Sequence, residues 1–256
     1  MQRKGVYMSR IKFMNTEIDN ITMDEALAKM DELILKNKNS FVVTPNVDHL
    51  IQLERGGELV EAYKHADLIL TDGKPLIWIS KYYGTPIKEK ISGSDLFPRL
   101  CELAAQKGYR MYFLGAAEGV AAKAAENLMT KYPGLQVVGT YSPPYGFEKD
   151  ETEMDKIKRQ IKETNPHILI VGLGAPKQEL FILHNREELG VPLSLGLGAS
   201  LDFEAGNIKR APKWMADHGF EWLYRITQDP KRLAKRYLVD DIKIIRMAIK
   251  YRKVSK

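Results

Sequence analysis

The chain has only one cysteine, Cys101, among its 256 residues, which excludes a framework of internal disulfides. A single thiol fits the reducing cytosol, and a lone cysteine is expected to be a small buried residue rather than a nucleophile. Long apolar runs are missing as well: the longest, Ile168 to Pro176, contains glycines and is shorter than the roughly 20 residues of a membrane-spanning helix. The basic start of the chain lacks the apolar stretch of a secretory signal, so any membrane contact is expected to be made from the side.

Metal-binding patterns are also lacking. No paired ligand spacing relates the five histidines, and no Asp-x-Asp sequence stands at the end of an expected strand. We therefore expect neither a metal nor another cofactor. A site without a metal has to stabilise a negatively charged leaving group with Arg, Lys and the N-terminal ends of helices.

Charge is unevenly distributed along the chain. The net charge is +6, but the segment from Lys209 onward carries fourteen Lys or Arg against five Asp or Glu, which leaves 25 basic and 28 acidic residues before it. The body is therefore mildly acidic and the C-terminal segment strongly basic. Such asymmetry is typical of contact with a polyanion, either nucleic acid or an anionic membrane.

Short β-rich runs alternate with helical segments through about residue 200. The runs are rich in Val, Ile, Leu and Tyr and are bounded by Gly, Pro or Asn, which is typical of buried strands. This alternation predicts an α/β fold, a Rossmann-like parallel sheet sandwiched by helices. The expected strands are Phe41 to Asn46, Asp67 to Gly73, Arg110 to Gly115, Gln136 to Tyr141, His167 to Gly172 and Pro192 to Gly198; the expected helices are Thr22 to Leu35, Ser94 to Gln106, Glu118 to Lys131, Asp150 to Glu163 and Lys177 to Leu189.

Polar residues collect where the expected strands end, and ligands of open parallel sheets bind beyond these carboxyl ends. Asp72 ends the second strand, and its carboxylate could serve as a general base for a substrate hydroxyl. The alternative is that Asp72 caps the helix expected to begin near Pro75. Thr44 and Asn46 occupy the equivalent loop after the first strand and offer hydrogen-bonding groups for sugar hydroxyls or phosphate, with a plain turn or an Asn N-cap as the alternative.

The segment GLGAPKQE, residues 172–179, is a candidate for phosphate binding. Its two glycines let backbone N–H groups approach an anion at the start of the next helix, while Lys177 adds a cation and Gln178 an amide. The segment matches neither the dinucleotide fingerprint nor the Walker loop, which favours a diphosphate-bearing ligand other than NAD or ATP. Tight packing of the strand on the helix explains the same glycines equally well.

The sequence changes character after about Ala205. Strand signals end, Trp214 and Trp222 occur, and basic residues become dense. We therefore predict two parts, an α/β catalytic core over residues 1–205 and a basic helical appendage over residues 206–256.

The end of this appendage predicts one amphipathic helix from Lys231 to Lys253. Its apolar and basic side chains recur in steps of three and four on different faces, which is typical of a helix lying on an anionic membrane. Each basic residue near such a surface contributes about 1 kcal/mol. Packing of the apolar stripe on the core is one alternative; nucleic-acid binding is another, without a recognisable reading motif. The stripe comprises Ala234, Leu238, Ile242, Ile245 and Ile249, and the basic face Arg232, Arg236, Lys243, Arg246, Lys250 and Lys253.

Seven segments of the chain match one known family, in the same order along the sequence. They are TPNVDHL (44–50), TDGKPLIW (71–78), SGSDL (92–96), FLGA (113–116), PPYGF (143–147), GLGAPKQE (172–179) and a long stretch over residues 196–237. Their combination resembles the WecG/TagA/CpsF glycosyltransferases of bacterial surface-polymer synthesis. The resemblance covers nearly the whole chain. Two departures, TDG where ADG is common and GLGASLDF where GVGGAFDF is common, leave Asp72 in place but bear on donor specificity.

The resemblance implies an inverting, metal-independent transfer of N-acetylmannosamine from UDP-N-acetylmannosamine (UDP-ManNAc) to undecaprenyl-diphosphate-linked N-acetylglucosamine (GlcNAc). This is an early step of wall teichoic acid synthesis. By the same resemblance Asp72 is the general base, and Thr44, Asn46 and Gln178 line the substrate pocket. Arg225 and Arg232 would reach back over the pocket to the diphosphate.

The expected location is cytoplasmic, peripheral on the inner face of the cell membrane, with the C-terminal helix on the anionic surface and no nucleic-acid partner. A homo-oligomer is left open by the sequence. Two alternatives for the function also stay open. One is the same fold with another UDP sugar, such as N-acetylmannosaminuronate, glucose or galactose. The other is a non-catalytic nucleotide-sugar-binding protein at the membrane.

Overall fold

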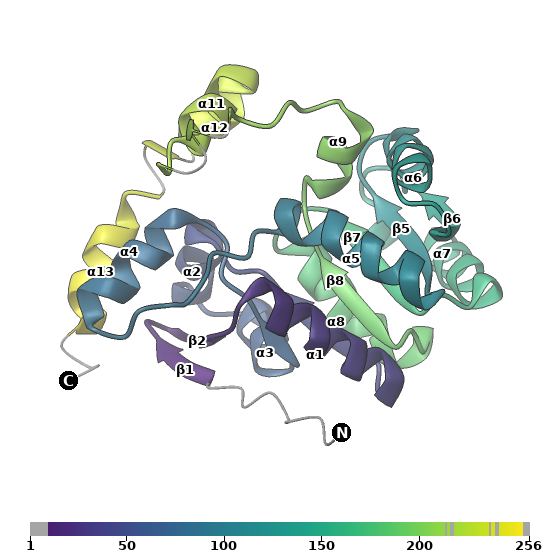
Figure 1. The fold of residues 1–256 in the computed structure, drawn as a ribbon, viewed down its shortest axis with the longest axis horizontal. Helices are drawn as coiled ribbons and strands as arrows, with labels where there is room; N and C mark the ends of the chain where they lie inside the picture. Colours follow the sequence, from purple (N-terminus) through teal and green to yellow (C-terminus); the bar gives the residue numbers. More distant parts are fainter. Residues whose placement is uncertain (1–9, 213, 216–217, 236, 239–240, 253–256) are drawn as a thin grey trace.

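A six-stranded parallel sheet forms the centre of the molecule, with strand order β4-β3-β8-β7-β5-β6 (Figure 1). The computed structural model describes residues 10–212, 214–215, 218–235, 237–238 and 241–252, except for the side chain of Arg232. The predicted α/β class and Rossmann-like sheet are confirmed. The strands are β3 (Ser40–Val43), β4 (Leu68–Ile69), β5 (Arg110–Gly115), β6 (Gln136–Tyr141), β7 (Ile168–Gly172) and β8 (Leu193–Gly196).

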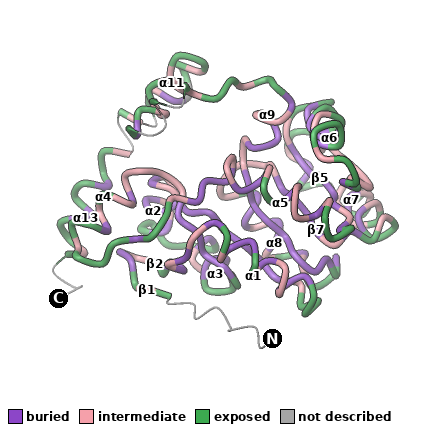
Figure 2. The backbone as a smooth tube through the Cα atoms, viewed as in Figure 1, coloured by how far each residue is buried: buried purple, intermediate pink, exposed green. Residues whose placement is uncertain are grey.

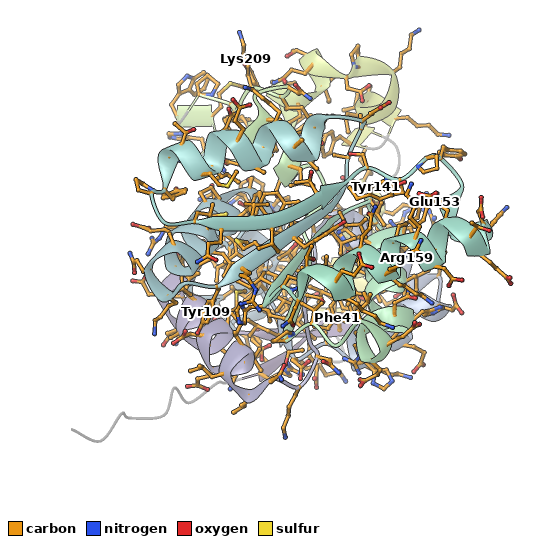
Figure 3. All side chains as sticks on the ribbon, turned by 90° about the vertical axis from the view of Figure 1, so that its right-hand side faces the viewer. Phe41, Tyr109, Tyr141, Glu153, Arg159 and Lys209 are labelled. Atoms are coloured by element: carbon orange, nitrogen blue, oxygen red, sulfur yellow. The ribbon has the colours of Figure 1, made fainter. Side chains whose placement is uncertain are left out.

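Burial of the strands follows their position in the sheet. Strands β3, β7 and β8 in the interior are almost wholly buried, because helices cover both faces, and their sequences are accordingly continuous apolar runs. Strand β6 lies at the edge and is only half-buried. Its last residue, Tyr141, donates a hydrogen bond to Glu153 on the neighbouring helix α7 (Glu151–Thr164). Figure 3 labels both residues on that side of the molecule.

Two apolar cores lie on the two faces of the sheet. Helices α1 (Met23–Lys36), α5 (Gly93–Lys107), α6 (Val120–Lys131) and α9 (Ser200–Ala205) contribute to one core. Helices α2 (Val47–Glu54), α3 (Glu58–Lys64), α7 and α8 (Lys177–Leu189), with the short η1 (Phe147–Lys149), contribute to the other. The five helices expected from the sequence are present, each within two residues of its expected ends.

The structure adds elements that the sequence patterns did not predict. An antiparallel hairpin, β1 (Arg10–Phe13) and β2 (Thr16–Asp19), precedes the sheet, and α3 lies between α2 and β4. The helix expected to begin near Pro75 is present as α4 (Lys74–Tyr83) after β4. The hairpin turn contains no glycine, so the usual turn signal is missing. Asp19 fastens the hairpin to the sheet, because its carboxylate accepts a hydrogen bond from Ile69 N–H at 2.8 Å.

The prediction of one continuous helix from Lys231 to Lys253 is wrong. The C-terminal segment instead forms α11 (Glu221–Gln228), α12 (Pro230–Lys235) and α13 (Lys243–Arg252), and the chain turns between α12 and α13. The turn changes which side chains α13 directs to the body. Helix α13 lies beside α2 and α4 in Figure 1, and its contacts with these two helices determine which of its faces is buried.

Helix α13 docks through a face that the sequence stripe did not include. Ile244, Met247 and Ala248 are buried, and the Tyr83 hydroxyl of α4 donates to the Ala248 carbonyl at 2.9 Å. The Glu54 carboxylate of α2 accepts from the Tyr251 hydroxyl at 2.7 Å. Most of the expected stripe faces outward, since Leu238, Ile242, Ile245 and Ile249 are each more than half exposed. Figure 2 shows buried and exposed residues alternating along α13.

We predict a large stability loss for Gly115→Ala at the end of β5. Gly115 has a φ of +113°, and an added Cβ would lie 2.5 Å from the Gly172 carbonyl oxygen, which belongs to a rigid neighbouring strand. The expected decrease in the free energy of unfolding, measured by urea denaturation, is about 3–5 kcal/mol. Gly190→Ala is the matched control, because its φ is also positive but no atom lies within 4 Å of the added Cβ. It should lose only about 1–2 kcal/mol, and equal losses would contradict the steric account.

Candidate active site

A cavity of about 620 Å³ opens beyond the carboxyl ends of β3, β4, β7 and β8. Its walls come from the loops that follow these strands, from residues 90–94 before and at the start of α5, and from the C-terminal segment. It therefore lies where an open parallel sheet places its ligands. Of the seven residues predicted to form the site, Thr44, Asn46, Asp72, Gln178 and Arg225 line this cavity.

Asp72 presents its carboxylate to the cavity. Its backbone N–H donates to Pro45 O at 2.8 Å, which fixes the loop after β4 against the loop after β3. Helix α4 has Gly73 as its N-cap and no side-chain cap, so the alternative role of Asp72 as a helix cap does not apply. Within the described residues, no hydrogen bond to the Asp72 carboxylate is found.

The surroundings raise the pKa of Asp72 to about 6. Burial is the largest cause, because it disfavours the charged form, and the negative charges of Glu221 and Asp95 act in the same direction. The positive charges of Lys90 and Arg225 oppose them. A carboxylate with such a pKa is mostly ionised at neutral pH and is a stronger base than an ordinary Asp.

The two residues of the loop after β3 have different local roles. Thr44 is buried at the cavity wall, and among the described residues its hydroxyl has no hydrogen-bonding partner. Asn46 is the N-cap of α2 and accepts a hydrogen bond from His49 N–H at 3.3 Å. The N-cap alternative for Asn46 is therefore confirmed, and the same side chain also lines the cavity.

Of the two candidate residues after β7, Gln178 lines the cavity and Lys177 does not. Gln178 is buried, and its Oε1 accepts from Gly198 N–H at 2.9 Å. Lys177 is exposed and is not among the cavity-lining residues; its Nζ lies 2.5 Å from a Glu148 carboxylate oxygen and 4.9 Å from the Tyr145 ring centroid. Gly172 is tightly packed, because an added Cβ would lie 2.9 Å from Leu201. The packing explanation of these glycines is thus confirmed for Gly172.

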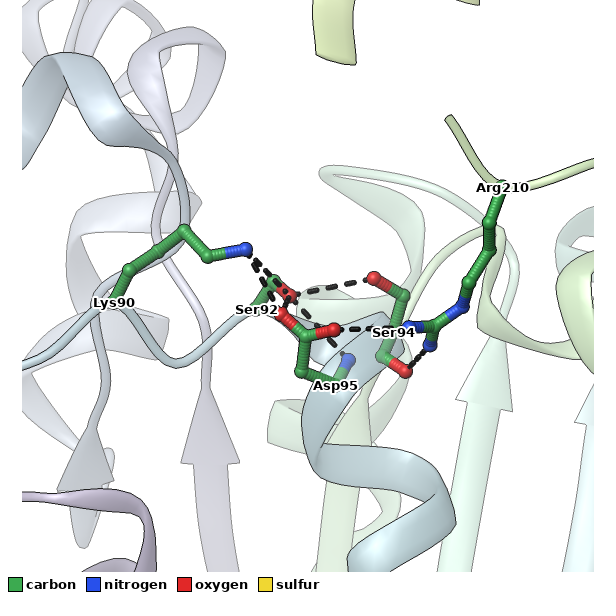
Figure 4. A network of polar contacts seen from close by, with 5 residues as sticks. All are labelled: Lys90, Ser92, Ser94, Asp95 and Arg210. Carbon is green, nitrogen blue, oxygen red and sulfur yellow. Dashed lines mark hydrogen bonds and ion pairs between the residues drawn. The ribbon is translucent and has the colours of Figure 1, made fainter. Parts of the chain in front are cut away.

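A cation that sequence reasoning missed, Lys90, also lines the cavity. Its Nζ donates to Asp95 Oδ2 at 2.8 Å and to Ser92 Oγ at 3.3 Å, as drawn in Figure 4. The other oxygen of Asp95 accepts from Arg210 of the C-terminal segment at 3.0 Å. The sequence hint for this cluster is the segment SGSDL, which starts a helix: Ser92 is the N-cap of α5 and accepts a hydrogen bond from Asp95 N–H.

The C-terminal segment closes one side of the cavity with polar and apolar residues. Arg225 lies there with its guanidinium 5.6 Å from the Phe203 ring centroid. Arg232 belongs to α12, but its side chain lies outside the described residues, so its predicted contact with a diphosphate stays a prediction. The other lining residues of this segment are Gly219, Glu221, Trp222, Tyr237, Asp241, Ile242, Ile244 and Ile245.

The described residues contain neither a cluster of metal ligands nor a helix that could span a membrane. No group of three or more His, Cys, Asp and Glu side chains there is placed to hold a metal ion. No helix in those ranges has both the length and the apolar character needed to cross a bilayer.

The cavity at the carboxyl edge of the parallel sheet thus combines two amides and two cations with a carboxylate that has no hydrogen-bonding partner among the described residues. This arrangement is suited to an α/β enzyme that transfers a group. The family model described as "Glycosyl transferase WecG/TagA/CpsF family" matches residues 11–256. The chain belongs to this family and is a glycosyltransferase.

Similar proteins carry one common name, N-acetylglucosaminyldiphosphoundecaprenol N-acetyl-beta-D-mannosaminyltransferase. The protein of that name from Bacillus spizizenii strain W23 is 31% identical over 255 residues, which cover 100% of this chain and 94% of the relative. The one from Bacillus subtilis strain 168 is 34% identical over 65% of this chain and 63% of its own. The one from Staphylococcus aureus strain MW2 is 25% identical over 89% and 88%.

We predict that the Asp72 carboxyl titrates near pH 6, and that two neighbouring charges move its pKa in opposite directions. Lys90→Met removes a positive charge and should raise the pKa, whereas Glu221→Gln removes a negative charge and should lower it. The carboxyl carbon of Asp72 can be followed by NMR in a selectively labelled protein. A midpoint near pH 4 in the unmodified protein, or shifts of the same sign in both variants, would contradict the electrostatic description.

Proposed function

We propose that the protein transfers N-acetylmannosamine, with inversion, from UDP-ManNAc to undecaprenyl-diphosphate-linked GlcNAc, an early step in the synthesis of the wall teichoic acid linkage unit. The observation that carries the proposal is the Asp72 carboxylate, which has a pKa of about 6 and faces the cavity without a hydrogen-bonding partner among the described residues. The acceptor and the transferred sugar come from the name shared by the relatives.

Asp72 acts as the general base in this proposal. Its carboxylate takes the proton of the acceptor hydroxyl while that oxygen attacks the anomeric carbon of the donor. A carbon–oxygen bond to the acceptor forms, the bond from the anomeric carbon to the β-phosphate oxygen breaks, and UDP leaves with the electron pair. Removal of a proton by a well-placed base contributes roughly 10²- to 10⁴-fold to the rate.

Cations at two walls of the cavity support the departure of UDP. Lys90 comes from the core and Arg225 from the C-terminal segment, and both charges also act on Asp72. Gly174 and Ala175, which precede the Pro176 N-cap of α8, line the cavity beside the positive end of that helix. The proposed reaction therefore needs no metal, and Arg232 is proposed as a further diphosphate contact.

The proposed place of action is the inner face of the cell membrane, and α13 supports it. The outward stripe of Leu238, Ile242, Ile245 and Ile249 is exposed, while the opposite face of α13 packs on the body. Helix α13 has basic residues and no acidic ones. An apolar face beside basic side chains is suited to an anionic bilayer surface.

The stripe also continues into the cavity. Ile242 and Ile245 belong to the exposed stripe and line the cavity at the same time. Trp222 and Ile244 extend this apolar rim. A lipid-linked acceptor could therefore leave its isoprenyl chain on the apolar rim while its sugar reaches Asp72.

We predict that Asp72→Asn abolishes transfer to a soluble lipid-diphosphate analogue, with a fall of at least 10²-fold in kcat, because the amide cannot accept the proton. The folded protein should become more stable at pH 7.5. Its Asp72 pKa of about 6 lies above the ordinary value of 3.8, so ionisation destabilises the fold as pH rises through that window, by up to about 3 kcal/mol.

Activity by product formation and stability by thermal unfolding are measured on the same samples. Asp24→Asn is the control, since Asp24 is exposed and lies outside the cavity. Near-normal turnover of Asp72→Asn would refute the base assignment.

We predict that Ile249→Asp weakens sedimentation with vesicles containing anionic phospholipid by roughly tenfold or more, because an apolar contact of about 1.5–3 kcal/mol is replaced by a charge. Ile249 does not line the cavity, so activity on a water-soluble acceptor should persist. Leu35→Asp is the matched control on α1, since Leu35 is also more than half exposed but belongs to a different helix. Equal loss of vesicle binding in both variants would rule out the α13 surface.

A further inference from the structure

A second groove, of about 300 Å³, lies between α2 and α13 and has no part in the proposed reaction. None of its residues lines the catalytic cavity, so the two places are separate. The C-terminal end of α2 forms one wall of this groove, and α13 forms the other. The lining residues are Ile51, Glu54 and Arg55 at the end of α2, and Lys243, Arg246, Met247 and Lys250 on α13.

Positive charge dominates the groove. Four Lys or Arg side chains line it against the single carboxylate of Glu54, which leaves a net charge of +3. The C-terminal end of α2 adds only about half a negative charge. The Glu54 carboxylate accepts from Lys250 Nζ at 2.5 Å and from the Tyr251 hydroxyl at 2.7 Å. Because these bonds hold α13 against α2, the groove is formed without a ligand.

Two of the cations, Arg55 and Arg246, have no hydrogen bond or ion pair to their guanidinium groups among the described residues. A guanidinium presents its N–H donors in a planar fork that matches the oxygens of a phosphate. One of these groups comes from the end of α2 and the other from α13. A phosphate in the groove would therefore accept charge-assisted hydrogen bonds from both walls.

The cations of α13 lie between its exposed stripe and its docked face. Successive residues of an α-helix advance by about 100° around the axis, so their positions can be ordered by angle. On this scale Arg246 lies about 60° from the exposed Ile249. Lys250 and Lys243 follow within about a further 60°, and the buried Met247 lies beyond them.

This order brings the groove to the level of phospholipid headgroups. An interfacial helix buries its apolar face about 5–10 Å into the boundary between headgroups and acyl chains. With Ile245 and Ile249 on the bilayer, the neighbouring cations lie beside the lipid phosphates. A nucleic acid would leave this apolar stripe in water, and a free anion would make no use of it, so a lipid fits the surroundings of the groove best.

We propose that the groove binds the phosphate of one anionic phospholipid headgroup, with Arg55 and Arg246 as its principal ligands. The choice of a lipid rests on the proposed membrane face of α13, whereas the reaction at Asp72 plays no part in it. Diffuse attraction to an anionic surface requires only the charge of basic residues. A binding site also requires the geometry of the guanidinium groups.

Binding is measured on the full chain with dihexanoyl phosphatidylglycerol below its micelle-forming concentration, so that no bilayer is present. The reporter is the Met247 methyl group, which lines the groove and can be followed by NMR in methionine-labelled protein. It should shift saturably with this lipid. The Kd should be at least about tenfold higher for dihexanoyl phosphatidylcholine, whose headgroup has no net charge. Equally tight binding of inorganic phosphate would overturn the assignment to a lipid.

Three variants separate a site from diffuse attraction. Arg246→Gln should raise the Kd for phosphatidylglycerol roughly tenfold, as expected for the loss of a charge-assisted hydrogen bond. Arg246→Lys keeps the charge but not the planar fork, and should raise the Kd about threefold. Arg252→Gln is the matched control on the same helix, because the Arg252 guanidinium lies outside the groove, 4.1 Å from the Tyr82 ring centroid. Its Kd should change less than about twofold.

The same variants are then compared by sedimentation with vesicles that contain phosphatidylglycerol. A site in the groove predicts the same ranking as in solution, with the largest loss for Arg246→Gln and the smallest for Arg252→Gln. Equal losses in these two variants, with none in Arg246→Lys, would mean that charge alone attracts the surface and would overturn the proposal. Loss of sugar transfer with intact lipid binding would count against the proposed reaction alone.

Discussion

The electrostatic balance around Asp72 is the constraint on which the rest of the cavity depends. Burial disfavours the charged carboxylate, and Glu221 and Asp95 add to this effect, while Lys90 and Arg225 oppose it. The outcome is a carboxylate that is mostly ionised at neutral pH yet more basic than that of an exposed Asp. Since Glu221 and Arg225 both belong to α11, the position of the C-terminal segment helps to set the chemistry of a residue in the core.

That segment is held to the core at two separate places. Arg210 binds Asp95 near the start of α5, and α13 binds α2 and α4 through Tyr251 and the Ala248 carbonyl. Between these contacts the chain forms a wall of the cavity. One face of α13 is thus used for docking, while the apolar stripe remains on the outside.

The sequence predicted the parallel sheet well, because buried strands between helices produce continuous apolar runs. It also identified Asp72, Thr44, Asn46 and Gln178 from their position after strands. The sequence did not predict Lys90, because its place in the cavity wall and its ion pair with Asp95 arise only when the chain folds. The helix predicted from Lys231 to Lys253 was too long, because a periodic pattern does not reveal a turn in the chain. Tertiary contacts determine which face of α13 is buried.

The central claim is that the C-terminal segment completes the catalytic site and does not serve as an anchor alone. The most direct measurement is the kcat/KM of a chain that ends at Arg210, assayed with a water-soluble acceptor so that membrane attachment plays no part. Loss of Glu221, Trp222 and Arg225 from the cavity should reduce kcat/KM by about 10²-fold or more, with the core still folded by thermal unfolding. Full activity of the shortened chain would contradict the account.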